Sequence, residues 1–503
     1  MANPIKQLAG QTAIYGFSTI IGRLLNYLLV PLHVAIFQPA AYGVVTELYA
    51  YASFLAVILT YGMETAFFRY LNKVDHKAEN TFRTAFSSLI FTSLVFLALT
   101  LLFEENVANF ILYPGHSEYV LWFALILAFD SLSSLPMAKL RSENKSLLFA
   151  SVNIFSILIT VALNLFFLLY CKPNYDAGNS NWLIDSVYSP EIGVGYIFIA
   201  NMIGSMLKFV MLIPFMLRTK GVFDWALLKT MLYYALPLMF FGLAGIVNET
   251  FDRILLRRIL SETKGDVYAK IQVGIYGANY KLAMLITIFI QAFRYAAEPF
   301  FFSHEKQENS RFTYAYIMQV FVGVVGSLFL VVTLYMDLFK HIIIPNENYW
   351  SGLRIVPILL MANIFLGIYY NLGVWFKLSG KTRQGMYISI IGAIITIGLN
   401  IWLIPYFEYM ASAWITLISY FSITIFSYFL GRKYYPIPYN IGRIAYYILT
   451  PVFIYLLLQQ IDIDNIFIKY SIHSLFLITF VASFYYLEFK AANSLTSNKN
   501  EIK

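Results

Sequence analysis

Long apolar runs separated by short polar segments fill the chain from end to end. About fourteen of them approach the roughly 20 residues that a helix needs to cross a bilayer core. They lie at roughly 8–34, 42–70, 84–103, 118–138, 148–170, 192–217, 229–256, 272–301, 312–335, 351–376, 385–404, 409–430, 441–459 and 468–489. The runs are continuous rather than alternating, which argues against a β-barrel. Since unpaired backbone groups are costly in hydrocarbon, the pattern predicts an all-α polytopic membrane protein.

Two stretches of the chain repeat each other at a constant offset. Tyr42-Gly43 returns as Tyr276-Gly277, and the carboxylate Glu64 returns as Glu298. Such duplication is typical of transporters, which bind their cargo between equivalent halves. An even number of spans separates equivalent positions, so the predicted pseudo-two-fold axis follows the membrane normal. The repeat predicts the following domains: a six-helix lobe over 1–220, a six-helix lobe over 221–432, two additional helices over 433–490 and a disordered tail over 491–503.

Composition and charge agree with a membrane protein. Of the 503 residues, 59% are hydrophobic and 12% charged, whereas soluble domains carry about 25% charged residues. The net charge of +8 comes from short basic loops that alternate along the chain, so nucleic acid binding is not expected. The alternation predicts an even number of spans and two cytoplasmic termini. The longest outward loop, about 172–191, is too short for a fold of its own.

The sequence offers little support for catalysis. Cys171 is the only cysteine, which excludes an internal disulfide and a cysteine metal cluster. The six histidines are scattered, and neither a Walker motif nor a nucleophile elbow occurs. We therefore expect a transporter rather than an enzyme. It needs no cofactor or metal, and a proton or sodium ion could couple its cycle.

Ionisable residues inside the predicted spans are the candidate functional residues. A charge at the bilayer centre costs about 2.5–3.5 kcal/mol on the lenient insertion scale, so each needs a partner or a purpose. The predicted substrate-binding cations are Arg23, Arg253, Arg257, Lys281 and Arg294. The candidates for gating or ion coupling are Glu47, Glu64, Asp130, Glu249, Asp252 and Glu298.

Several of these residues allow two interpretations. Glu249, Arg253 and Arg257 share one helical face at i, i+4 and i+8, which is either a cavity patch or a self-neutralising set of ion pairs. Arg23 has no carboxylate four residues away, and we expect it to contact substrate. Asp130 either binds a coupling cation or, as we favour, bonds to neighbouring serine hydroxyls.

The repeat also places opposite charges at equivalent positions. Glu47 aligns with Lys281, near the outer ends of spans two and eight. One hypothesis is that the two side chains pair across the cavity and close its outer mouth; the alternative is that each faces water separately.

Three segments resemble a known family. The opening LAGQTAIYGFSTIIGRLLNYLLVPL and the following AAYGVVTELYAYASFLAVILTYGMETAFFRYL are similar to the first two spans of the polysaccharide biosynthesis flippases. GLNIWLIPYFEYMASAWITLISY resembles their spans eleven and twelve, with Asn400, Pro405 and Ser419 at the expected places. These flippases belong to the multidrug/oligosaccharidyl-lipid/polysaccharide (MOP) exporter superfamily, and the resemblance covers nearly the whole chain.

The resemblance implies a MATE-like bundle of six plus six helices in the inner membrane that opens alternately to either side. Its cargo would be a polyprenyl-pyrophosphate-linked oligosaccharide, moved to the outer leaflet for O-antigen, capsule or exopolysaccharide synthesis. Glycosyltransferases and a polysaccharide polymerase would be its partners. The five cations would then offset desolvation of the pyrophosphate.

Two other functions remain open at this point. A cation-coupled multidrug antiporter of the same superfamily would need a dominantly acidic cavity, whereas cations are at least as frequent as acids here. A membrane polysaccharide polymerase would be expected to carry large outward loops with clustered catalytic residues.

Overall fold

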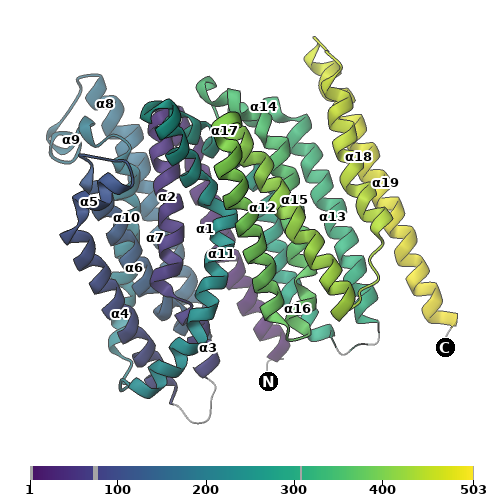
Figure 1. The fold of residues 1–503 in the computed structure, drawn as a ribbon, viewed down its shortest axis with the longest axis horizontal. Coiled ribbons are helices and arrows are strands. Elements are labelled where there is room, and N and C mark those ends of the chain that lie inside the picture. The colour runs from purple at the N-terminus through teal and green to yellow at the C-terminus, as the bar shows by residue number, and fades with distance from the viewer. Residues whose placement is uncertain (1–3, 72–76, 306, 308, 502–503) are drawn as a thin grey trace. The chain divides into compact units, whose positions relative to one another are not determined.

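The structure is a computed structural model that describes residues 4–71, 77–305, 307 and 309–501, and this part of the chain is helical (Figure 1). The elements are α1 (Pro4–Ile36), α2 (Pro39–Thr60), α3 (Met63–Leu71), α4 (Ala78–Leu102), α5 (Glu104–Phe110), α6 (Ser117–Ser142), α7 (Ser146–Leu165), η1 (Phe166–Cys171), α8 (Lys172–Asp176), α9 (Trp182–Val187), η2 (Pro190–Ile192), α10 (Gly195–Leu217), α11 (Trp225–Lys264), α12 (Asp266–His304), α13 (Ser310–Leu334), α14 (Met336–Ile343), η3 (Glu347–Ile355), α15 (Val356–Leu372), α16 (Val374–Leu378), α17 (Thr382–Tyr434), α18 (Ile441–Gln459) and α19 (Ile466–Glu501). The predicted all-helical class is confirmed.

Among the described residues, 12 helices are long and apolar enough to cross a membrane. One of them, α17, consists of two helices joined at Glu408, whose backbone (φ 54, ψ −136) is not helical. The apolar part of α1 that can be assessed, Ile20–Ile36, is shorter than a span. The exact number of fourteen spans stays a prediction.

The chain forms two compact units. Unit 1 comprises Met1–Gly277 and Ile397–Tyr409, and unit 2 comprises Ala278–Thr396 and Met410–Lys503. The boundary differs from the predicted one near residue 220 because α11 packs against α2, α3 and α4 within unit 1. The division into lobes of six helices stays a prediction.

In unit 1, α10 packs on α6 and α7, and α1 packs on α7. A buried cluster that includes Met63, Phe67, Phe82 and Leu140 joins α3, α4 and α6. The helices α2 and α12 approach so closely that the backbone of Gly43 contacts the backbone of Gly274. Small residues permit such contacts between membrane helices, where close packing rather than water exclusion drives association.

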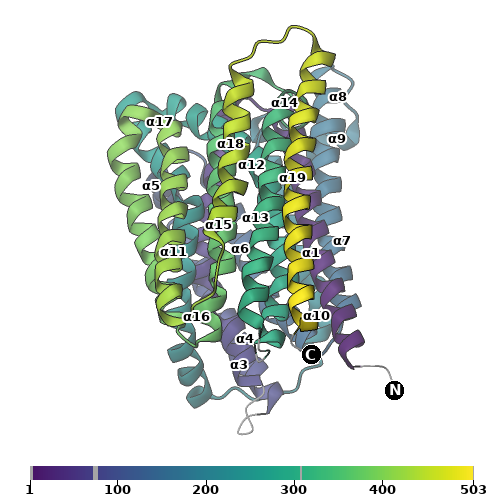
Figure 2. The same cartoon turned by 90° about the vertical axis from the view of Figure 1, so that its right-hand side faces the viewer.

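In unit 2, α18 and α19 pack against α13, and Figure 2 shows these helices side by side. Asp337 on α14 bonds to Lys340 (2.9 Å) and to Lys469 of α19 (2.7 Å). The hydrogen bonds from Lys469 and Lys340 lower the pKa of Asp337 to about 2. The carboxylate therefore stays charged at neutral pH and fastens the start of α19 to α14.

The polar segment at 172–191 contains the short helices α8 and α9 (Figure 1). Ile184 and Tyr188 of this segment pack in a small core with Phe167, Cys171 and Tyr196 of the adjoining helices. The helix α19 has its last residue at Glu501, and the disorder of the 491–503 tail stays a prediction.

Candidate functional site

The predicted cation Arg257 of α11 is fully buried in unit 1. Its Nε lies 3.2 Å from Glu47 Oε2 on α2, and its Nη2 pairs with Asp266 at the start of α12. Tyr113, which precedes α6, donates a hydrogen bond to the same Glu47 oxygen. Lys270 completes the group by pairing with Asp266 at 2.9 Å. We call these five residues the buried charge network; its two cations and two carboxylates balance one another.

Arg253, one turn earlier on α11, is also neutralised within unit 1. Its Nη1 lies 2.9 Å from Asp252 Oδ1, and Tyr276 donates a 2.5 Å hydrogen bond to the other Asp252 oxygen. The expected pair with Glu249 does not form: Arg253 donates to the Glu249 carbonyl oxygen at 2.5 Å, and the Glu249 side chain is exposed. Arg253 and Arg257 thus pair with carboxylates other than Glu249, and both interpretations of this helical face stay predictions.

The remaining unit 1 candidates lie apart from this network. Arg23 is exposed and has no ion pair with any side chain that the structure describes. Glu64 pairs with Arg141. Asp130 lies 3.5 Å from Lys208. Of the neighbouring serine hydroxyls that we expected to hold Asp130, those of Ser131 and Ser134 bond to backbone carbonyls, and that of Ser133 is buried without a partner among the described residues.

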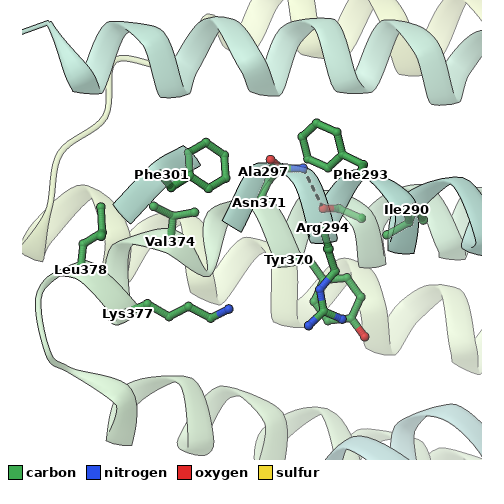
Figure 3. Close-up of a pocket in the computed structure, with 11 residues that line it drawn as sticks. Ile290, Phe293, Arg294, Ala297, Phe301, Tyr370, Asn371, Val374, Lys377 and Leu378 are labelled. Carbon is green, nitrogen blue, oxygen red and sulfur yellow. Dashed lines mark hydrogen bonds between the residues drawn. The ribbon is translucent and has the colours of Figure 1, made fainter. Parts of the chain in front are cut away.

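The clearest cavity that contains a predicted cation is in unit 2 (Figure 3). One wall is a stripe along α12: Ile290, Phe293, Arg294, Ala297 and Phe301. The facing wall comes from α15 and α16: Gly367, Tyr370, Asn371, Val374, Lys377 and Leu378. Residues three or four apart share a helical face, which explains how each stripe forms. The space is about 430 Å³, and we call it the Arg294 pocket.

The two cations of the Arg294 pocket lie on the same side of it (Figure 3). The Arg294 guanidinium lies over the Tyr370 ring, 4.0 Å from its centre. Figure 3 shows Lys377 extending towards Arg294, with Phe301, Val374 and Leu378 on the apolar side. Asn371 donates to the Gly367 carbonyl at 3.2 Å, while its own side-chain oxygen is buried without a partner among the described residues. The described lining contains two cations and no carboxylate.

Two further predicted residues belong with α12. The side chain of Glu298 lies outside the described residues, although its position on α12 is one turn beyond Arg294. Lys281 is partly buried in unit 2, whereas Glu47 belongs to unit 1. The gate between Glu47 and Lys281 therefore stays a prediction.

Lys377 was not among the predicted site residues, because it follows an apolar run and resembles an ordinary basic loop residue. Positions 367, 370, 371, 374, 377 and 378 nevertheless keep a helical spacing across that run's end. This spacing was the available signal that the helical face continues as far as Lys377.

Comparisons with known proteins agree with this architecture. A model of the family described as "Polysaccharide biosynthesis protein" matches residues 8–305, more than half of the chain. No curated protein matches the chain.

Solved structures of transporters share the fold. Lipid II flippase MurJ, in an inward closed conformation, has a TM-score of 0.72 at 14% identity, covering 94% of this chain and 98% of that one. A multidrug resistance MATE family transporter of the MOP superfamily, in an inward-facing conformation, has a TM-score of 0.61 at 14% identity, covering 85% and 95%. A MOP superfamily transporter from Pyrococcus furiosus has a TM-score of 0.58 at 13% identity, covering 84% and 95%. The predicted MATE-like fold is confirmed.

Proposed function

Because the chain belongs to the polysaccharide biosynthesis protein family, we propose that it is a flippase for a polyprenyl-pyrophosphate-linked oligosaccharide. It moves this lipid from the cytoplasmic to the outer leaflet of the inner membrane, where the sugar enters surface polysaccharide. Basic residues gather in alternate loops along the chain, which supports a cytoplasmic position for both termini. Alternating access accounts for transport without any covalent change to the cargo.

The observation that carries this proposal is the composition of the Arg294 pocket. A pyrophosphate must lose water when it enters a membrane protein, and charge-assisted bonds from Arg294 and Lys377 would offset that cost. The apolar side suits an isoprenoid chain, since burial of apolar surface is favourable by about 25 cal/mol per Å². The unpartnered oxygen of Asn371 is an acceptor for a sugar hydroxyl.

Each polar residue has a distinct part in this mechanism. Tyr370 holds the guanidinium of Arg294 by a cation–π contact, which orients its donors before the cargo arrives. Lys377 adds a second charge from the opposite wall. Binding can drive the cycle only if the cargo stabilises one conformation more than the other. Contacts from Arg23 and Lys281, and coupling to a proton or sodium ion, remain part of the proposal.

The nearest alternative is a multidrug antiporter, because MATE transporters share the fold. A cationic drug would be repelled by Arg294 and Lys377, and the described lining offers no carboxylate to receive it. A polymerase is less well supported. It would be expected to carry catalytic residues clustered in a large outward loop, whereas the 172–191 segment is short and is held together by an apolar core.

Replacing Arg294 or Lys377 with alanine is expected to slow flipping about 10- to 100-fold. A hydrogen bond to a charged group contributes about 1.5–3 kcal/mol, and about 1.4 kcal/mol corresponds to tenfold. Transport would be measured in proteoliposomes as cargo reaching the external leaflet, after normalisation to protein content. Arg311→Ala is the matched control: this cation of unit 2 stacks on Tyr435 outside the pocket and should leave the rate within about twofold.

Depletion of the protein in cells tests the direction of transport. The lipid-linked oligosaccharide should then accumulate on the cytoplasmic face, where periplasmic sugar-modifying enzymes cannot reach it. Accumulation wholly on the outer face would refute the flippase assignment.

A further inference from the structure

A segment with proline at two alternate positions forms one wall of a second cavity, also in unit 2. The chain between α17 and α18 reads Tyr435-Pro-Ile-Pro-Tyr439. Tyr435, Ile437 and Tyr439 line the cavity, whereas Pro436 and Pro438 are exposed. Each proline fixes φ near −65°, and the Tyr439 N–H donates to the Ile437 carbonyl oxygen at 2.9 Å in a tight turn about Pro438. The segment is therefore a stiff wall that brings two phenols, those of Tyr435 and Tyr439, to the cavity.

The opposite walls come from α15, α16 and α17. Trp375 is buried, and its indole donates to Ser427 at 3.1 Å, which fixes the ring. Gly431 lies against this ring: a Cβ there would be 2.8 Å from Trp375 Cδ1. The next residue, Arg432, borders the cavity; its empty space, counted together with the opening to solvent, is about 220 Å³. We call this space the tyrosine cup.

The polar groups of the tyrosine cup are mainly hydrogen-bond donors without partners. Among the described residues, the hydroxyls of Tyr428, Tyr435 and Tyr439 make no hydrogen bond. Burial and the nearby phenols of Tyr435 and Tyr428 raise the pKa of Tyr439, as expected if the three hydroxyls converge. Arg432 is exposed and has no carboxylate partner within the described part of the chain.

This donor set discriminates between classes of ligand. The lining residues include no carboxylate and no carboxamide. A phenol hydroxyl both donates and accepts, so the three phenols could bond to a sugar hydroxyl or to a phosphate. The Arg432 guanidinium only donates and carries a positive charge, so it is the group that favours an anionic acceptor. The chemistry of the cup therefore favours phosphate.

The position of the cup suggests where that phosphate comes from. Arg432 and Lys433 form the basic last turn of α17. Lys381 lies 3.6 Å from the ring centre of Tyr434, and Arg311 lies 4.7 Å from that of Tyr435. Basic pockets between membrane helices on the cytoplasmic side bind anionic lipid headgroups. An ordinary belt of interfacial aromatic residues would not require the rings of Tyr428 and Tyr439 to lie 6.5 Å apart beside Arg432 in one cavity.

We propose that the tyrosine cup binds the phosphate of an anionic phospholipid from the cytoplasmic leaflet. Arg432 and the three phenols hold the phosphate, and Leu372 and Ile437 contact the beginning of the acyl chains. The site is separate from the Arg294 pocket and does not depend on the flippase assignment. Occupancy by the surrounding membrane would brace the connection between α17 and α18.

Native mass spectrometry of the purified full chain tests the site with phosphatidylglycerol, and phosphatidylcholine serves as the neutral comparison. Arg432→Ala should weaken phosphatidylglycerol binding about tenfold or more, and Tyr439→Phe about threefold, since the latter loses one hydroxyl donor. Lys433→Ala is the matched control, because it removes the adjacent charge without altering the cup's lining. It should change binding less than about twofold.

Three outcomes would overturn the proposal. Equal weakening by Arg432→Ala and Lys433→Ala would indicate general attraction to the basic surface. Equal affinity for phosphatidylcholine and phosphatidylglycerol would exclude recognition of an anionic headgroup. Complete displacement of the lipid by millimolar inorganic phosphate would assign the cup to a free anion. None of these outcomes bears on transport, so the flippase proposal stands or fails separately.

Discussion

Alanine at Gly43 is expected to destabilise the protein strongly, with loss of most transport activity. A Cβ atom there would lie 2.1 Å from the carbonyl oxygen of Lys270. At Gly274, the reciprocal position, a Cβ would lie 1.9 Å from the carbonyl oxygen of Pro39. These neighbours are backbone atoms and cannot move aside by changing rotamer. Overpacking typically costs about 1–3 kcal/mol, and a backbone clash belongs at the upper end or beyond.

The measurement is the melting temperature of each variant in detergent, followed by size-exclusion chromatography, together with its flipping rate. Gly398→Ala is the matched control in a helix of the same unit, because no atom lies within 4 Å of its added Cβ. It should be neutral or slightly stabilising, since alanine is the better helix former by about 1 kcal/mol. Equal melting temperatures for the Gly43, Gly274 and Gly398 variants would show that α2 and α12 do not pack as described.

This contact shows what a repeat in the sequence can and cannot reveal. Tyr42-Gly43 and Tyr276-Gly277 were recognisable as equivalent copies of one motif. The structure adds that the two copies lie on helices that contact each other, because a Cβ at Gly277 would meet Thr46 Oγ1 at 2.3 Å. Periodicity along a chain predicts which positions are equivalent. It does not predict whether equivalent positions meet, since that depends on how the helices are arranged.

The positions of the spans were largely predictable because a bilayer imposes a length and an apolar composition. Span seven was predicted over 229–256, whereas α11 continues to Lys264. The charged residues after position 256 looked like the end of the span. The helix continues because Arg257 is neutralised by two carboxylates outside its own helix. Glu47 lies far away in the sequence, on α2, and Asp266 is at the start of the next helix, α12.

The same reason limited the prediction of functional residues. Sequence reasoning marked intramembrane charges as positions that need a partner, but it could not assign those partners. It named Arg294 and overlooked Lys377, which faces it across one pocket. It grouped Arg253 with Glu249 by helical spacing, yet the adjacent Asp252 holds the guanidinium. A spacing rule describes one helix, whereas a buried charge selects among all the groups packed around it.

Replacing Arg257 with methionine is expected to cause the largest loss of stability of any single charge change in unit 1. Removal of one partner from a buried ion pair costs about 3–5 kcal/mol, because the other charge stays buried and unpaired. The two carboxylates that contact Arg257 differ in this respect. Asp266 is 48% exposed and keeps its ion pair with Lys270, whereas Glu47 is 1% exposed and would keep the hydrogen bond from Tyr113 and no ion pair within 4 Å among the described residues. The unpaired charge of Glu47 should therefore account for most of the stability that Arg257→Met loses.

Because Glu47 and Asp266 differ in this way, the stability of a double variant is the decisive measurement. Adding Glu47→Gln to Arg257→Met removes the stranded charge and should recover about half or more of the lost stability, measured as the melting temperature in detergent. Arg258→Met is the matched control: the neighbouring guanidinium lies 4.7 Å from the Phe110 ring centre and should cost about 1 kcal/mol or less. If Glu47→Gln instead lowered the stability of Arg257→Met further, the carboxylate could not be the stranded group. The buried charge network would then owe its stability to contacts other than this ion pair.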